Sequence, residues 1–279
     1  MNLGIVADEI DRDFGKAVAI GKSVGISRYE VRNLVSGRIP VCDAAEIAAI
    51  ERQEVEITAI SPGLFKFTED SASFAREMAE VYPRAAELAH RWRIPGLIVF
   101  GFHKPGATEA NPRTAGPPPG RITEWLRAAA ERAAADGLVL MIEPEPICWC
   151  DTATRTADLI RATATAALRI NYDPGNVAWL ENRDPLDEFA AAAPWIANVH
   201  VKDLRPLARG HGHPEWVPAG DGMIDYAAHF AALRRIGYSG PISLEPHMDG
   251  RPETIARAKL AVERIAAALE TGSVENSVR

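Results

Sequence analysis

The segment LRINYDPGNVAWLENRDPLDEFAAAAPWIANVHVK, residues 168–202, places an alanine-rich helical stretch between two short β-rich runs, LRINYD and ANVHVK. The same alternation extends to both ends of the chain. The other β-rich runs are LGIVA (3–7), RYEVR (28–32), VEITAI (55–60), GLIVFG (96–101), LVLMIE (138–143) and PISLEP (241–246). Such alternation predicts an α/β fold with a mainly parallel sheet covered by helices. Eight strands is the number that closes a (β/α)8 barrel.

The helical stretches have the length and period that such a barrel needs. Apolar residues recur at steps of three and four over 73–92, and the stretch 123–137 closes with Gly137 at its C-cap. Further helices are expected at 44–53, 187–194, 226–240 and 253–270. The 279 residues are close to the roughly 250 of a typical barrel. We therefore predict a single-domain (β/α)8 TIM barrel over 1–270 and a polar tail at 271–279.

Two segments rich in Gly and Pro interrupt this rhythm. They are residues 103–121, after the fourth expected strand, and residues 205–222, after the seventh. Each follows the carboxyl end of a strand, which is the face where barrel enzymes build their active sites. We interpret both as walls or lids of an active site.

Composition excludes several classes of protein. The net charge of −7 provides no basic field for nucleic acid. No apolar stretch has the length of a signal peptide or a membrane span, so we expect a cytoplasmic protein without a membrane partner. Three cysteines, Cys42, Cys148 and Cys150, form no disulfide framework, and we interpret them as packing or loop residues.

Four of the later strands end in a residue that binds divalent cations. These residues are Glu143 in LMIEPEP, Asp173 in INYDPGN, His200 in ANVHVKD and Glu245 in ISLEPH. In a closed barrel these strand ends surround one mouth, so the four side chains can share a small volume. Three carboxylates and an imidazole suit Mn²⁺, Mg²⁺, Co²⁺ or Zn²⁺, and Mn²⁺ is the ion that we expect.

Each of these residues also has a purely structural interpretation. A single acid at a strand end is often a helix N-cap or an ion-pair partner, and a single histidine in a strand is often a core residue. Four such residues at successive strand ends, each within a buried apolar run, would leave unpaired charge. One divalent cation would neutralise that charge.

The same motifs carry a family resemblance over essentially the whole chain. NVHVKD and SLEPH, with the Glu of MIEPEP and the Asp of NYDPGN, resemble the xylose isomerase-like barrel superfamily. The group that is most similar contains sugar phosphate isomerases and epimerases, including ketose 3-epimerases, hydroxypyruvate isomerases and inosose dehydratases. The resemblance implies that Glu143, Asp173, His200 and Glu245 are the metal ligands. It also implies that Glu143 and Glu245 form the catalytic acid/base pair.

Several positions depart from the pattern of this family. Asn176 stands where members often have a histidine, and Trp149 stands where ketose 3-epimerases have a glutamate. Arg205 lies near the place of an arginine of the epimerases, one residue short in register. We expect Asn176, Trp149 and Arg205 to contact substrate, together with Lys202 and His103.

Other residues near the expected mouth have two interpretations. For His211 and His213 a solvated loop is favoured over a site. Trp179 and Trp216 either stack on a sugar or pack the mouth.

The predicted function is that of a divalent-metal-dependent isomerase or epimerase of a small carbohydrate, either a sugar, a sugar phosphate or a keto-polyol. The metal would stabilise an enediolate while one carboxylate removes a proton and the other returns it. A dehydratase or lyase acting on a keto-sugar or inosose is the nearest alternative, because the same enediolate can expel a leaving group. Zinc-cluster endonucleases and non-catalytic sugar-binding barrels are more distant alternatives. The sequence leaves a homo-oligomer open.

Overall fold

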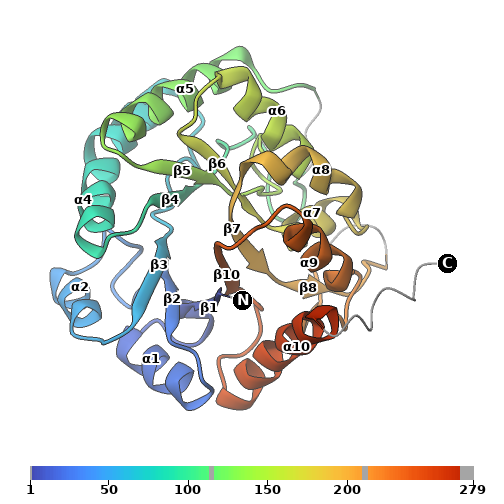
Figure 1. Cartoon of the computed structure of the whole chain (residues 1–279). Helices are drawn as coiled ribbons and strands as arrows, with labels where there is room; N and C mark the ends of the chain where they lie inside the picture. The colour runs from blue at the N-terminus through green and yellow to red at the C-terminus, as the bar shows by residue number, and fades with distance from the viewer. Residues whose placement is uncertain (1, 113–115, 209–212, 271–279) are drawn as a thin grey trace.

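The computed structural model describes residues 2–112, 116–208 and 213–270. Among these residues, eight parallel strands close into a barrel in the order β1-β10-β7-β6-β5-β4-β3-β2 (Figure 1). The barrel strands are β1 (Asn2–Val6), β2 (Arg28–Val31), β3 (Glu56–Ile60), β4 (Gly96–Val99), β5 (Val139–Ile142), β6 (Leu168–Tyr172), β7 (Ile196–Val201) and β10 (Pro241–Leu244). Every strand begins within one residue of the start of a predicted run and ends within two residues of its end. The predicted single-domain barrel is therefore confirmed.

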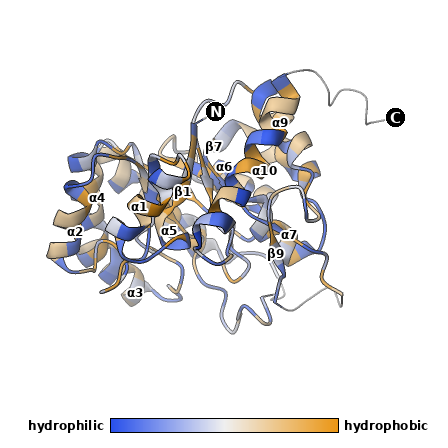
Figure 2. Ribbon diagram, turned by 90° about the horizontal axis from the view of Figure 1, so that it is seen from below, coloured by the Kyte–Doolittle hydropathy of each residue, from blue (hydrophilic) through white to orange (hydrophobic). Residues whose placement is uncertain are grey.

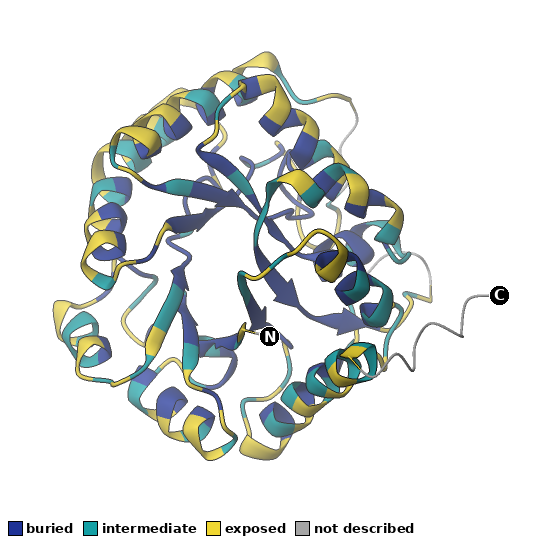
Figure 3. Cartoon of the chain, in the orientation of Figure 1, coloured by how far each residue is buried: buried dark blue, intermediate teal, exposed yellow. Residues whose placement is uncertain are grey.

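Helices surround the barrel, and most of them are exposed on their outer faces (Figures 1 and 3). They are α1 (Phe14–Ser23), α2 (Ala44–Glu51), α3 (Ser71–Arg76), α4 (Tyr82–Trp92), α5 (Gly120–Ala135), α6 (Ala153–Thr163), α7 (Pro174–Glu181), α8 (Phe189–Ala192), α9 (Tyr226–Arg235) and α10 (Pro252–Glu270). The helices α1, α6 and α7 are additional to those predicted. The helix expected over 73–92 is interrupted by a π-helical turn, Glu77–Val81, just before Pro83. Proline has no N–H to donate to the preceding turn.

The core lies between the strands and the helices as well as inside the barrel. Figure 3 shows the strands buried and the helices exposed on their outer faces. Tyr29, Tyr82 and Tyr172 are among the largest fully buried side chains. The burial of apolar side chains on both faces of a parallel sheet explains why the strands read as continuous apolar runs.

The described part of the segment after β7 contains regular structure. It contains a two-stranded antiparallel pair, β8 (Asp203–Leu204) and β9 (Trp216–Val217). Asp203 holds the loop together, because its carboxylate accepts hydrogen bonds from the backbone N–H groups of Leu204, Gly220, Gly222 and Ile224. Figure 2 shows the loop with β9 on the side of the barrel away from the N-terminus.

Some predictions fall on residues that are not described. His211 and the tail 271–279 lie outside the described residues. Among the described helices, none combines the length and apolar composition needed to cross a bilayer. Cys42, Cys148 and Cys150 are buried free thiols.

Candidate metal centre

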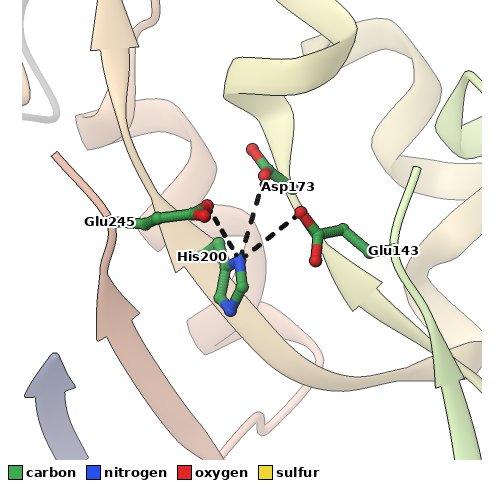
Figure 4. A group of neighbouring side chains, drawn as sticks. All are labelled: Glu143, Asp173, His200 and Glu245. Atoms are coloured by element: carbon green, nitrogen blue, oxygen red, sulfur yellow. Dashed lines mark ion pairs between the residues drawn. The ribbon is translucent and has the colours of Figure 1, made fainter. Parts of the chain in front are cut away.

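The four predicted ligands converge at one end of the barrel. Glu143, Asp173 and Glu245 directly follow β5, β6 and β10, whereas His200 is the penultimate residue of β7. Each offers a ligand atom, and these atoms all lie within 4.8 Å of one another. All four residues are buried. Figure 4 shows the carboxylates of Glu143 and Glu245 on opposite sides of the His200 imidazole.

The two nitrogens of His200 face different partners. Nδ1 lies 3.1 Å from Glu245 Oε2, 3.8 Å from Glu143 Oε1 and 3.9 Å from Asp173 Oδ2. Nε2 lies 2.8 Å from Oε2 of Glu30, a completely buried residue of β2. A carboxylate that accepts the Nε2 proton leaves the lone pair of Nδ1 directed at the ligand cluster.

Asp173 is both a helix N-cap and an ion-pair partner. Its Oδ1 accepts a hydrogen bond of 3.0 Å from the Asn176 N–H and thereby caps α7. Its Oδ2 lies 2.7 Å from Nζ of Lys202 but, although buried, accepts no hydrogen bond of acceptable geometry. Gly175 permits this approach, because a Cβ there would lie 2.3 Å from Cγ of Lys202.

Two cations hold Glu245 in place. Nζ of Lys202 lies 2.6 Å from Glu245 Oε2, and the Arg32 guanidinium makes a short ion pair with Oε1. Arg32 also binds Asp8 at 3.1 Å and Glu9 at 2.9 Å. The rigid fork of an arginine can serve several carboxylates at once. Carboxylates nevertheless outnumber permanent cations around the cluster.

The two glutamates have opposite electrostatic environments. Burial raises the pKa of Glu143, and the negative charges of Glu245 and Asp173 add to that effect. Burial would also raise the pKa of Glu245, but Lys202, His200 and Arg32 hold that pKa well below its usual range.

The donor set fits a divalent cation. It combines three buried carboxylates and one imidazole nitrogen, and Glu30 supports the imidazole from behind. The buried Oδ2 of Asp173, which accepts no hydrogen bond, and the excess of carboxylates over cations also favour a bound cation. The residues that would hold the ion are Glu143, Asp173, His200 and Glu245.

The predicted substrate residues occupy different surroundings. Lys202 lies within the cluster, and the Asn176 side chain donates to Glu143 Oε1 at 3.1 Å. Trp149 packs into the hydrophobic core. His103 pairs with Glu69 through Nδ1 at 2.7 Å, and Arg205 lies at the surface, paired with Glu215 at 3.0 Å. The structure thus brings Lys202 and Asn176 to the ligands and leaves Arg205 at the surface.

Aromatic rings line the mouth beside the cluster. Trp216 contacts Trp179 and His247, with centroid distances of 6.1 and 5.0 Å, and Nζ of Lys202 lies 5.9 Å from its ring. These contacts agree with the predicted position of Trp179 and Trp216 at the mouth of the barrel. His213 is exposed, as a solvated loop residue should be.

Sequence reasoning missed the residues that support the cluster from the first strands. Glu30, Arg32 and Glu9 received no role. His247 lies in the SLEPH motif, yet its contact with Glu9, at 3.0 Å, was not foreseen. The available signal was an acid inside the run RYEVR, which is unusual for a buried strand.

Curated relatives of this chain carry the name L-ribulose-5-phosphate 3-epimerase. L-ribulose-5-phosphate 3-epimerase UlaE of Shigella flexneri serotype 5b (strain 8401) is 32% identical over 156 residues, which is 56% of this chain and 53% of that protein. UlaE of Shigella dysenteriae serotype 1 (strain Sd197) is 25% identical over 209 residues, covering 75% and 69%. SgbU of Escherichia coli (strain K12) is 27% identical over 126 residues, covering 45% and 44%. The chain thus spans about half the length of several of its relatives. These names agree with an enzyme.

Solved structures share the fold. A structure of L-ribulose 3-epimerase has a TM-score of 0.70 at 19% identity and covers 99% of both chains. The probable 3-DHS dehydratase AsbF from Bacillus anthracis has 0.69 at 18% identity, covering 94% of this chain and 99% of its own. The IOLI protein with a zinc atom has 0.69 at 17% identity, covering 98% and 96%.

The sequence family gives the most extensive match. The model of the xylose isomerase-like TIM barrel matches residues 37–266, which include all four candidate ligands and most of the closed barrel. This chain belongs to the xylose isomerase-like TIM barrel family.

Proposed function

We propose that this chain is a divalent-metal-dependent epimerase or isomerase of a ketose or ketose phosphate, with Glu143 and Glu245 as its acid and base. The observation that carries the proposal is the convergence of ligand atoms from Glu143, Asp173, His200 and Glu245 within 4.8 Å of one another. A divalent cation bound there would polarise the substrate carbonyl and stabilise the enediolate that follows loss of the neighbouring proton. Mn²⁺ is our expected ion, with Mg²⁺, Co²⁺ or Zn²⁺ as alternatives.

The placement of the two glutamates supports a two-base reaction. They enter from β5 and β10 on opposite sides of His200 (Figure 4). A planar substrate between them would present one face to each carboxylate. Removal of a proton on one face and return on the other inverts a carbon, whereas return to the adjacent carbon isomerises the sugar.

The chain's own contacts would keep these carboxylates in position. The Asn176 side chain donates a hydrogen bond to Oε1 of Glu143. Arg32 and Lys202 form ion pairs with the two carboxylate oxygens of Glu245. Fixed carboxylates need little reorganisation when the proton moves.

Elimination is the second candidate reaction. The same proton removal leads to a dehydratase or lyase if a leaving group lies beside the new carbanion. Asn176 leaves this candidate open, because its side chain donates to Glu143 and Pro144 at a position where many members of the family have a histidine. Ultraviolet absorption by a conjugated enone product would identify elimination.

The test is solvent exchange with a panel of ketoses and ketose phosphates in heavy water. Wild-type protein loaded with Mn²⁺ should incorporate deuterium beside the carbonyl of its substrate. Glu143→Gln and Glu245→Gln should each lower turnover by about 10²–10⁴-fold while keeping the metal. Glu188→Gln is the control, because Glu188 is a buried carboxylate that binds Arg183 and the Thr154 N–H instead. Near-normal turnover in both variants would refute the two-base reaction.

The remaining functional assignments are part of the same proposal. The partner is a small carbohydrate that contacts Lys202 and Asn176 beside the ligands. Substrate contacts of His103, Trp149 and Arg205 stay predictions. A cytoplasmic location and a homo-oligomer stay predictions.

A further inference from the structure

The metal ligands and three neighbouring cations come from different parts of the barrel. The four ligands belong to β5, β6, β7 and β10, whereas Arg32, Arg38 and Lys66 belong to β2, β3 and their loops. Arg32 pairs with the ligand Glu245, and Lys66 pairs with Glu145, two residues after the ligand Glu143. Arg38 and Lys66 both lie over the ring of Phe100, so all three cations lie near the ligand cluster. A substrate held at the ligands would therefore have a positively charged wall beside it.

Two of these three cations already have carboxylate partners. Arg32 binds Asp8, Glu9 and Glu245, as described above. Nζ of Lys66 lies 2.9 Å from Glu145 Oε2. These ion pairs satisfy the charges of Arg32 and Lys66 within the protein.

Arg38 differs, because its partners are neutral. Its Nε donates to the Ser61 carbonyl at 2.8 Å, and its Nη2 donates to the Ser61 hydroxyl at 2.7 Å. Its Cζ lies 5.7 Å from the centre of the Phe100 ring. Of the described carboxylates, none has an oxygen within 4.0 Å of the Arg38 guanidinium. Nη1 likewise has no partner within the described part of the chain.

The local backbone is shaped to receive this guanidinium. Gly63 has a φ of +79°, and a Cβ at that position would lie 2.9 Å from both Cδ and Nε of Arg38. Only glycine combines that backbone conformation with such a close approach. Ser61, Gly63 and Phe100 thus hold the side chain in one orientation.

A partly buried charge without a counter-ion is costly. Burial lowers the pKa of Arg38 to about 10, and repulsion from Arg32 adds to this effect. The group is still protonated at neutral pH. Its unused N–H groups can form the paired, charge-assisted hydrogen bonds that phosphate and carboxylate oxygens accept.

We propose that Arg38 binds an anionic oxygen group of the substrate, so that the enzyme acts on a phosphorylated or carboxylated ketose. This inference rests on the proposed function for the reacting end of the substrate. The anionic group would lie over β2 and β3, and the reacting carbons would lie between Glu143 and Glu245. Lys66, whose Nζ lies 5.0 Å from the same Phe100 ring, borders the anion site.

The test measures binding to metal-loaded protein by calorimetry. The probes are L-ribulose 5-phosphate, 5-keto-D-gluconate, neutral L-ribulose and inorganic phosphate. Wild type should bind one charged sugar at least about 10-fold more tightly than L-ribulose. Arg38→Gln should reduce that preference by about 10- to 100-fold. Preference for L-ribulose 5-phosphate identifies a phosphorylated substrate, and preference for 5-keto-D-gluconate identifies a carboxylated one.

Three variants serve as comparisons. Arg38→Lys keeps the charge without the fork and should retain part of the preference. Gly63→Ala should displace the guanidinium and weaken binding of the charged probe. Arg235→Gln removes one exposed charge at the end of α9 and should have no effect.

Two results would overturn the assignment of Arg38. One is equal affinity of wild type for neutral and charged sugars, and the other is an intact preference in folded Arg38→Gln. A failure of the proposed function would give a different result. Deuterium exchange would then be absent with every ketose, whereas the Arg38-dependent binding of inorganic phosphate would be unchanged. Asp173→Asn, which lacks a metal ligand, should likewise still bind inorganic phosphate.

Discussion

Glu30 and His200 form a completely buried pair, with Oε2 of Glu30 2.8 Å from Nε2 of His200. The contact joins β2 to β7 across the barrel interior. It directs Nδ1 of His200 toward the carboxylates of Glu143, Asp173 and Glu245. A glutamate that received no role in the sequence thus orients a ligand of the candidate metal centre.

Substitution of Glu30 should weaken metal binding. In Glu30→Gln the amide oxygen can still accept a hydrogen bond from Nε2, but it carries no negative charge. The imidazole is then less polarised, so His200 becomes a poorer ligand. Loss of such supporting carboxylates typically costs about 10- to 100-fold in metal affinity. Competition with a fluorescent chelator measures the change. Glu69→Gln, at the exposed His103 pair, is the matched control. Equal affinities in both variants and wild type would contradict the role of Glu30.

Removal of metal by EDTA should leave the fold intact. The barrel closes through backbone pairing and a continuous apolar core, and Lys202 already neutralises part of the charge on Asp173 and Glu245. We expect an unchanged far-ultraviolet circular dichroism spectrum and a lower Tm, because bound metal stabilises only the folded state.

Lys202 gives this prediction a second measurement. In Lys202→Met the two carboxylates lose their ammonium partner, so the decrease in Tm on metal removal should become larger. A chelated wild type that lost its helical signal would show that the ion is needed for folding.

Acid should destabilise the protein partly through Asp184. Burial alone would raise the pKa of Asp184, but hydrogen bonds from His229 and from the N–H groups of Asp225 and Leu186 hold that pKa below its usual range. A carboxyl with a lowered pKa in the folded state contributes stability above its unfolded pKa. That contribution is lost as the pH falls through the folded pKa.

Urea unfolding at pH 5 and at pH 3 measures this effect. The midpoint should decrease between the two pH values, and the decrease should be smaller in Asp184→Asn. Asp187→Asn is the control, because Asp187 is exposed and pairs with Arg183 at the surface. An equal decrease in wild type and Asp184→Asn would exclude Asp184 as a source of the acid sensitivity.

Short-range patterns in the sequence predicted the strands and the four ligands. An apolar run such as LRINYD forms a buried strand because both faces of a parallel strand are covered, and its last residue emerges at the mouth. The positions of Glu143, Asp173 and Glu245 therefore followed from local sequence. The N-cap contact of Asp173 is also local, since its partner is only three residues away, although the helix α7 that it caps was not predicted.

Only the tertiary structure decided which side chains surround those ligands. Glu30 and His200 are 170 residues apart, and Arg32 and Glu245 are 213 apart. Such partners meet because β1 pairs with β10 and closes the barrel, and no local pattern encodes that juxtaposition. The isolation of Arg38 from carboxylates is likewise a property of the closed barrel. Charge compensation depends on distances between strands that are remote in sequence. The sequence therefore determined the candidate ligands, and the closed barrel determined their electrostatic environment.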